Sequence, residues 1–408
     1  MKIFLKNNID RVILGADRLL MLLGTRVGSR RRPCGTGILI PSAGGGNIGD
    51  VAMLESLIPK LPNIEEWNII VTSACSYSEE HLQNFGTSTV SPRLLYSRSP
   101  RHFLEWWRLA RSLRQADTVL IVGADVMDGA YAPLSSGRLW TVAEFSVKGG
   151  AATRVLGFSW NSSPHALAAK SAAKAGTAGV EIVARDPESY ERLRRLGIQG
   201  IALGADLVFS LDVTPARPLD PTALRWLGSA GPRAIVNISG LLQARRDQLE
   251  EYCSIIRGLQ ERGFNVLLLP HVTHEGADDV AAQAALLDAL QDDQSGGCWS
   301  IGDLLPPAQI RYLTERADVI MTGRMHLSIL GLLGGKAPIV LATQGKVRGL
   351  LEMFGISELS IEPDPGFGTL VLDAIDKLRI EADAYHNAVL NGLPLVVQAS
   401  QENFKHLD

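Results

Sequence analysis

One stretch of the chain reads Ala317-Asp318-Val319-Ile320-Met321-Thr322-Gly323-Arg324-Met325-His326-Leu327-Ser328. It begins as an apolar strand, continues as a polar turn and leads into an apolar helix over residues 327–333. The turn carries Arg324 and His326, two residues apart. Arginine binds a carboxylate or phosphate through two parallel hydrogen bonds, and histidine transfers protons near neutral pH. We therefore expect chemistry on an anionic substrate where this strand ends.

The same alternation of apolar strands and amphipathic helices extends over most of the chain. Such alternation is typical of parallel sheets covered by helices on both faces. A proline-rich segment divides the strands into two series, so we expect an α/β protein with two Rossmann-like parallel-sheet domains facing a cleft. The expected strands are 37–41, 67–72, 118–122, 154–158 and 181–184, then 234–238, 265–270, 318–321 and 338–342.

This pattern also predicts the domain boundaries. An N-terminal extension (1–32) precedes the first α/β domain (33–212), and a linker (213–232) leads to the second (233–385). The last segment, 386–408, could pack back on the first domain.

Composition excludes several classes of protein. The 408 residues are 46% hydrophobic and 20% charged, with a net charge of −3, so the basic footprint of a nucleic-acid binder is missing. The four cysteines are far apart and form no C-x-x-C pair, so the sequence supports neither a disulfide framework nor a zinc cluster and fits a reducing compartment. No apolar run reaches the roughly 18 residues of a membrane span. We therefore expect a cytoplasmic protein without a metal centre.

The N-terminal extension has an amphipathic helical pattern. Its charged side carries Asp10, Arg11, Asp17 and Arg18, and arginines follow it at positions 26 and 30–32. Such a segment could lie on the inner face of an anionic membrane, or it could be a helix packed on the body of the protein. The apolar residues at helical spacing are Ile9, Val12, Ile13, Ala16, Leu19, Leu20 and Leu23.

Glycines or functional polar groups follow five of the expected strands. Because ligands of open α/β sheets bind outside the carboxyl ends of the strands, we expect these residues to line the cleft. The candidates are Gly46, Asn47, Asp50, Asp125, Asp128, Arg185, His271, Arg324 and His326.

The glycines at 44–49 match G-x-G-x-x-G, a pattern for dinucleotide binding at a helix N-terminus. The acidic residue that this reading requires after the second strand is absent, so we do not expect a dinucleotide. Asp186-Pro187 marks a helix start, which places Arg185 beside a helix N-terminus where anions bind.

Several candidates also have a purely structural interpretation. Asp50 could cap the helix that follows it. Asp125 and Asp128 could accept hydrogen bonds from loop amides, Arg185 could form a surface salt bridge, and His271 could be a hydrogen-bonded core histidine.

Several motifs follow one another in order: Gly44-Gly45-Gly46-Asn47-Ile48-Gly49-Asp50, Gly123-Ala124-Asp125, Arg185-Asp186-Pro187-Glu188-Ser189, Gly204-Ala205-Asp206, Arg324-Met325-His326, Gly335-Lys336-Ala337-Pro338-Ile339 and Lys346-Val347-Arg348-Gly349-Leu350. With these motifs the chain resembles the polysaccharide pyruvyl transferases over roughly residues 37–356. The Arg-x-His segment with the downstream Lys346 is the most specific part. The chain departs from the usual pattern at Gly123-Ala124-Asp125, where a run of glycines is more common.

The resemblance implies a GT-B-like fold, with the acceptor on the N-terminal domain and the donor on the C-terminal domain. It implies phosphoenolpyruvate as co-substrate, without a further cofactor. The acceptor would be a sugar of a cell-surface polysaccharide or of its lipid-linked precursor, and the product a pyruvate ketal on two of its hydroxyls.

The candidate residues fit this chemistry. Arg185 and Arg324, one from each domain, would clamp the carboxylate and phosphate of the donor. His326 is the expected general acid, and Asp50 or Asp125 the general base. Further expected substrate contacts are Lys346, His271, Gly46, Asn47 and Asp128.

The main alternative is a GT-B glycosyltransferase that uses a sugar nucleotide. Such enzymes often carry paired glutamates in the C-terminal domain, whereas residues 324–338 contain no acidic residue. A non-catalytic glycan-binding module is a third possibility, and the joint presence of Arg185, Arg324 and His326 speaks against it.

Overall fold

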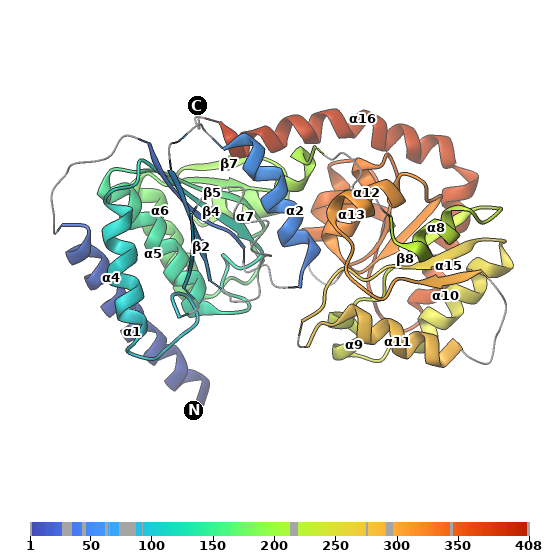
Figure 1. The fold of residues 1–408 in the computed structure, drawn as a ribbon, viewed down its shortest axis with the longest axis horizontal. Helices are drawn as coiled ribbons and strands as arrows, with labels where there is room; N and C mark the ends of the chain where they lie inside the picture. The colour runs from blue at the N-terminus through green and yellow to red at the C-terminus, as the bar shows by residue number, and fades with distance from the viewer. Residues whose placement is uncertain are drawn as a thin grey trace. The chain divides into compact units, whose positions relative to one another are not determined.

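The apolar runs of the sequence form two parallel sheets (Figure 1). The computed structural model of the protein describes residues 2–26, 35–42, 46–61, 64, 66–72, 87–91, 93–212, 219–274, 276–290, 297–342 and 346–405, without the side chains of residues 2–7 and 346. Unit 1 comprises Met1–Gly45, Met53–Leu207 and Gln398–Asp408, and unit 2 comprises Gly46–Ala52 and Val208–Val397. Each unit contains one sheet, which confirms the predicted α/β fold with two parallel-sheet domains.

The sheet of unit 1 has the strand order β3-β2-β1-β4-β5-β6-β7, and all its paired strands are parallel. The central strands are continuous apolar runs because helices cover both faces of such a sheet. The strands are β1 (Thr36–Ile40), β2 (Glu66–Val71), β3 (Thr87–Val90), β4 (Thr118–Ala124), β5 (Ala152–Phe158), β6 (Glu181–Ala184) and β7 (Ile201–Leu203).

The helices of unit 1 supply much of its buried surface. Trp140 of α5 packs edge-on against Phe158 and Trp160, which lie at and just beyond the end of β5. The described helices that lie wholly in unit 1 are α1 (Lys2–Gly24), α4 (His102–Leu113), α5 (Pro133–Gly149), α6 (Ala166–Ala178), α7 (Pro187–Arg195) and the short η1 (Ile58–Lys60) and η4 (Gln401–Phe404).

Helix α1, within the predicted N-terminal extension, packs against α4 and α5 (Figure 1). The side that packs carries Leu14 and Met21 together with the acidic residues, and Asp17 is fully buried between His102 of α4 and Arg138 of α5. Burial lowers the pKa of the Arg138 guanidinium, and the charge of Asp17 opposes this shift. The structure therefore agrees with a helix packed on the body, although the packed side carries the acidic residues.

The sheet of unit 2 has the order β10-β9-β8-β11-β12-β13 and is also parallel. Its strands are β8 (Arg233–Val236), β9 (Asn265–Leu268), β10 (Cys298–Ser300), β11 (Val319–Thr322), β12 (Ile339–Leu341) and β13 (Ser360–Ile361). The helices are α8 (Pro221–Leu227), α9 (Gly240–Arg245), α10 (Leu249–Glu261), α11 (Asp279–Leu290), α12 (Pro307–Thr314), α13 (Met325–Leu333), α14 (Lys346–Glu352), α15 (Phe367–Ile380) and most of α16 (Ala382–Ser400), with the short η2 (Leu207–Ser210) and η3 (Ser357–Leu359).

The division into units differs in detail from the boundaries expected from the sequence. The chain leaves unit 1 after Leu207 rather than at 212, and α8 lies inside the predicted linker, of which residues 213–218 fall outside the described part. Helix α2 (Ile48–Leu57) is shared, since Gly46–Ala52 group with unit 2. The final residues, Gln398–Asp408, group with unit 1.

A bilayer-spanning helix requires length and apolar character together. None of the described helices meets both conditions.

Candidate active site

Three neighbouring strands of unit 2 end in polar residues that meet at one carboxylate. The strands β9, β8 and β11 lie side by side, and His271, Asn237 and Arg324 follow them. All three contact Asp279, the first residue of α11. Because the carboxyl ends of parallel strands share one edge of the sheet, residues far apart in the sequence are brought together here.

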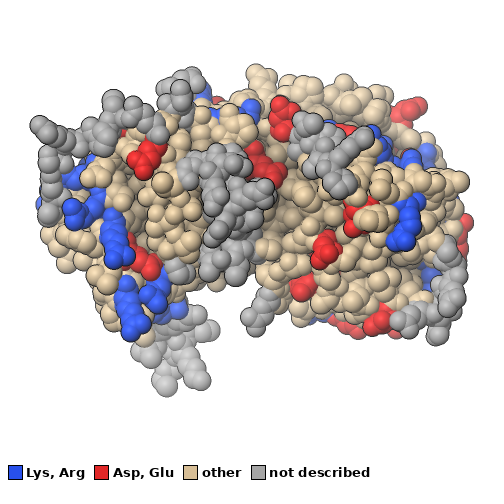
Figure 2. All heavy atoms as spheres, viewed as in Figure 1, with Lys and Arg blue, Asp and Glu red and all other residues tan. Residues whose placement is uncertain are grey.

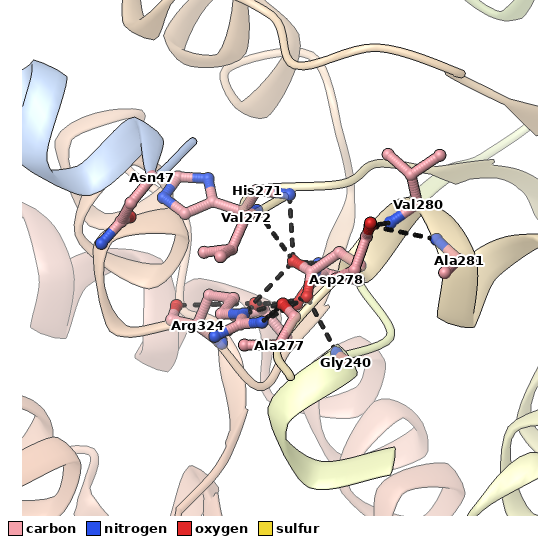
Figure 3. Close-up of polar contacts among 12 residues, drawn as sticks. Asn47, Gly240, His271, Val272, Ala277, Asp278, Val280, Ala281 and Arg324 are labelled. Atoms are coloured by element: carbon pink, nitrogen blue, oxygen red, sulfur yellow. Dashed lines mark hydrogen bonds and ion pairs between the residues drawn. The ribbon is translucent and has the colours of Figure 1, made fainter. Parts of the chain in front are cut away.

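The Asp279 carboxylate is fully buried and saturated with hydrogen-bond donors. Figure 3 labels four of the residues that contact it: Gly240, His271, Val272 and Arg324. Backbone N–H groups donate from Gly240 (2.8 Å), His271 (3.0 Å) and Val272 (3.1 Å). Asn237 Nδ2 donates at 2.9 Å. A buried carboxylate is stable only when charge and hydrogen bonds compensate it, and Arg324 supplies the charge.

Arg324 is held by this carboxylate through one edge of its guanidinium. Its Nε lies 3.1 Å from Oδ1 and 3.2 Å from Oδ2 of Asp279, and its Nη2 pairs with the same carboxylate and donates to the Ala277 carbonyl at 2.7 Å. Its Nη1 makes no hydrogen bond to any residue that the structure describes. The pairing therefore fixes the plane of the group and leaves one nitrogen for a ligand.

Arg324 is also the N-cap residue of α13, and His326 lies in the first turn of that helix. The backbone N–H groups and dipole at a helix N-terminus favour an anion. The half-buried His326 therefore lies beside a place where phosphate or carboxylate would bind.

The start of α2 packs against the loop that follows β9. Ile48 N donates to the His271 carbonyl at 3.1 Å, and Thr273 N donates to the Gly46 carbonyl at 2.7 Å. Gly46 has a φ of +69°, and a Cβ atom there would lie 2.3 Å from the Thr273 carbonyl oxygen. Only glycine fits this close approach, which gives the glycine-rich motif a physical reason.

Asn47 and Asp50 form a small network at the helix start. Asn47 Nδ2 donates to Asp50 Oδ2 at 3.1 Å, and Asn47 Oδ1 accepts from the backbone N–H of Gly49 at 3.0 Å. Asp50 is 9% exposed and lies in the first turn of α2. Both residues, predicted from the sequence as candidates, therefore lie in unit 2 with His271 and His326.

Gly49 touches the ring of His326. A Cβ atom on Gly49 would lie 2.0 Å from His326 Nδ1 and 2.5 Å from its Cγ. We expect Gly49→Ala to displace the imidazole and to destabilise unit 2 by about 1–3 kcal/mol, as overpacking does. Denaturant unfolding measures this change. Gly15→Ala in α1, where no atom lies within 4 Å of the added Cβ, is the matched control and should be neutral or stabilising. Equal effects of the two substitutions would contradict the contact.

His271 is 1% exposed, and neither ring nitrogen has a hydrogen-bond partner among the described residues. Its pKa lies well below 6.5, mainly because burial penalises the charged form and further because of electrostatic interactions with the neighbouring His326 and Arg324. His271 is therefore neutral at pH 7, with one donor and one acceptor nitrogen. The predicted alternative of a hydrogen-bonded core histidine does not describe it.

This burial makes the stability of unit 2 depend on pH. Below pH 6.5 the unfolded chain takes up a proton on His271 while the folded chain does not, so stability falls as the pH drops from about 6.5, by up to ~1.4 kcal/mol per pH unit. Unfolding of wild type and His271→Gln at pH 7.5, 6.5 and 5.5 should show a shallower decline in the variant. His386→Gln, at an exposed histidine, should follow wild type. Parallel curves for wild type and His271→Gln would refute this expectation.

The remaining candidates of unit 1 lie beyond β4 and β6. Arg185 is 3% exposed: its Nε donates to Ser159 Oγ at 2.7 Å and its Nη1 pairs with the buried Asp206 at 2.8 Å. The pair is thus internal and not the surface salt bridge considered as an alternative. Arg185 Nη2 makes no hydrogen bond to a described residue, and its role as a second anion ligand stays a prediction. Asp186 caps α7, as predicted, by accepting from Ser189 N at 2.8 Å.

Asp128 and Asp125 accept hydrogen bonds from loop residues. Asp128 accepts from the backbone N–H groups of Ala130 (2.8 Å) and Asn161 (3.1 Å), as its structural interpretation predicts. Asp125 accepts from the Tyr131 hydroxyl at 3.3 Å and is half-buried. Lys346 is the first residue of α14, and its side chain lies outside the described part of the structure.

The family model of the polysaccharide pyruvyl transferases matches residues 47–345, which is more than half of the chain. The chain belongs to this family. The match includes Asn47, His271, Arg324 and His326, whereas Gly46 lies one residue before it. No match is found among the curated proteins.

Solved structures similar to this family member confirm the GT-B-like fold. A putative UDP-N-acetylglucosamine 2-epimerase from Listeria monocytogenes has a TM-score of 0.57 at 12% identity, covering 89% of this chain and 91% of that one. The UDP-GlcNAc 2-epimerase from Neisseria meningitidis, bound to UDP-GlcNAc, has a TM-score of 0.55 at 10% identity over 90% and 100%. A glycosyltransferase from Rickettsia africae has a TM-score of 0.55 at 14% identity over 92% and 99%.

At Gly123-Ala124-Asp125, where this family member departs from the usual glycine run, the backbone adopts a conformation that favours glycine. Ala124 has a φ of +46°, the left-handed region, and it is the one non-glycine residue among those described that adopts it. Glycine reaches this conformation without strain, so a glycine is the expected residue there. Alanine keeps the same turn at a cost of about 1–2 kcal/mol.

Proposed function

We propose that this transferase moves the pyruvyl group of phosphoenolpyruvate onto two hydroxyls of one sugar in a cell-surface polysaccharide or its lipid-linked precursor. The family supports a transferase with a polysaccharide acceptor. One observation supports this choice of donor: Arg324 and His326 lie within one turn at the N-terminus of α13. A small donor with phosphate and carboxylate groups fits an arginine, a helix N-terminus and a proton donor.

The reaction balances without an external oxidant or cofactor. His326 protonates the methylene carbon of the donor, which leaves an oxocarbenium-like centre on the adjacent carbon. A sugar hydroxyl attacks this centre, phosphate departs, and the second hydroxyl closes the ketal. Of the two hydroxyl protons, one replaces the proton given by His326 and the other leaves with phosphate.

Arg324 would hold the donor through Nη1, because Asp279 already occupies its other edge. The neutral His271 can donate one hydrogen bond to an anion without adding charge. Asp50 or Asp125 is the proposed base for the sugar hydroxyls. Asn47 and Gly46 shape the start of α2 beside His271, while Arg185, Asp128 and Lys346 complete the proposed substrate contacts.

The test uses purified full-length protein with phosphoenolpyruvate and a synthetic glycoside in deuterated water. We expect acceptor-dependent phosphate release and one deuterium in the methyl group of the ketal, detected by mass spectrometry. A methyl group without deuterium would show that the methylene carbon is not protonated during the reaction. Turnover of a sugar nucleotide, with none of phosphoenolpyruvate, would instead establish the glycosyltransferase alternative.

The proposal requires no cofactor beyond the co-substrate, and dialysis against a chelator should leave activity unchanged. A cytoplasmic location, expected from the cysteine pattern, belongs to the same proposal. Detection of the native protein in the cytoplasmic and membrane-surface fractions of cells, and not outside them, tests this location.

A further inference from the structure

Helix α1 turns its acidic side chains into the protein. Asp10 and Asp17 are 1% and 0% exposed. Arg98 donates to both oxygens of Asp10 at 2.8 and 3.0 Å, and Arg138 Nε donates to Asp17 at 2.8 Å. His102 Nε2 lies 2.6 Å from the other Asp17 oxygen. Both carboxylates are thus compensated inside unit 1 and add little negative charge to its surface.

The opposite side of α1 is apolar and faces solvent. The residues on it are spaced by three, seven and four positions, which places them on one side of a helix. Leu104 of the neighbouring α4 is 64% exposed as well. We call these residues the apolar stripe: Ile9 (46% exposed), Val12 (73%), Leu19 (56%), Leu23 (45%) and Leu104. A helix normally buries such a side, so its exposure indicates a partner.

Arginines border the apolar stripe. The exposed ones on α1 and α4 and just beyond their ends are Arg11, Arg26, Arg101, Arg108 and Arg111. Figure 2 shows blue side chains gathered over α4 in this view. Glu105 is half-buried and accepts a hydrogen bond from Arg93 N at 3.1 Å. The charge exposed around the apolar stripe is therefore mainly positive.

We propose that the apolar stripe and its arginine border bind the surface of an anionic lipid bilayer. Apolar side chains of a helix lying flat enter the boundary between headgroups and acyl chains, and arginines are attracted to anionic headgroups. A second copy of the chain is a poorer partner, because it would bring arginines against arginines. This inference is independent of the proposed reaction, since binding can be measured without substrate.

Co-sedimentation of the full-length protein with vesicles tests the proposal. Binding should be strong to phosphatidylcholine vesicles that contain phosphatidylglycerol, weak to pure phosphatidylcholine, and reduced by salt. Val12→Glu combined with Leu19→Glu should lower the partition coefficient by at least ~10-fold. Arg108→Gln with Arg111→Gln should lower it roughly fivefold per arginine on anionic vesicles alone.

The matched control is Ile380→Glu with Leu395→Glu, two exposed apolar positions of unit 2 (84% and 68%). This variant should bind like wild type, and all variants should unfold at the wild-type temperature because every changed side chain is exposed. Equal losses in the control and in the Val12/Leu19 variant would overturn the proposal. So would a concentration-dependent dimer that Val12→Glu abolishes, which would assign the apolar stripe to a second copy.

Discussion

Replacing His326 with alanine is expected to lower kcat for ketal formation by about 10²–10⁴-fold, the range typical of a lost general acid. The affinity for phosphoenolpyruvate should change much less, because Arg324 and the start of α13 remain. Steady-state kinetics and donor titration calorimetry separate the two effects. Alanine at 326 also relieves the contact with Gly49, so the variant should fold normally.

The control is His386→Ala, which changes a histidine of unit 2 that lies exposed beside the Gly335 carbonyl. It should retain wild-type kcat. The proposed proton transfer fails if His326→Ala keeps kcat within twofold of wild type, or if it loses donor binding and kcat in equal measure.

Replacing Asp279 with alanine is expected to destabilise unit 2 by about 3–5 kcal/mol, since it leaves Arg324 without its buried counter-charge. It also removes the acceptor for the backbone N–H groups of Gly240, His271 and Val272. Denaturant unfolding of unit 2 measures the loss. Asp279→Asn keeps the shape but not the charge, and it should raise the KM for the donor because Arg324 is no longer fixed.

The neighbouring Asp278 offers a matched control. It accepts from the backbone N–H groups of Val280 and Ala281 at 2.9 and 3.1 Å and so caps α11. Asp278→Ala should cost only about 1 kcal/mol, as lost caps do. Similar losses at 278 and 279 would show that Asp279 is only a helix-end residue.

Much of the fold could be predicted from the sequence because its signals are local. Apolar runs bounded by glycine and polar turns mark the strands, and the rule for strand ends places His271 and Arg324 at one edge. Asp186 and Pro187 start α7 as expected from cap preferences alone. These inferences need only neighbouring residues.

The partners of these residues could not be predicted in the same way. Asp279 begins a helix 45 residues before Arg324, and nothing in its own surroundings distinguishes it from Asp278. The ion pair of Arg185 with Asp206 depends on two strand ends that only the finished sheet brings together. Periodicity shows that α1 has an apolar and a charged side, but Arg138 and His102, from two other helices, determine which side is buried.

The groups that meet at Asp279 belong to residues 237 to 324 and come from separate strands and helices. The chain must close these long loops before their contacts can form. We therefore expect the hydrogen bonds around Asp279 to form late in folding. If α11 does not dock, Arg324 lacks its counter-charge, and we expect that the proposed donor site does not form. We expect phosphoenolpyruvate at saturating concentration to slow hydrogen exchange at Gly240, His271 and Val272 together, because all three amides donate to the same carboxylate.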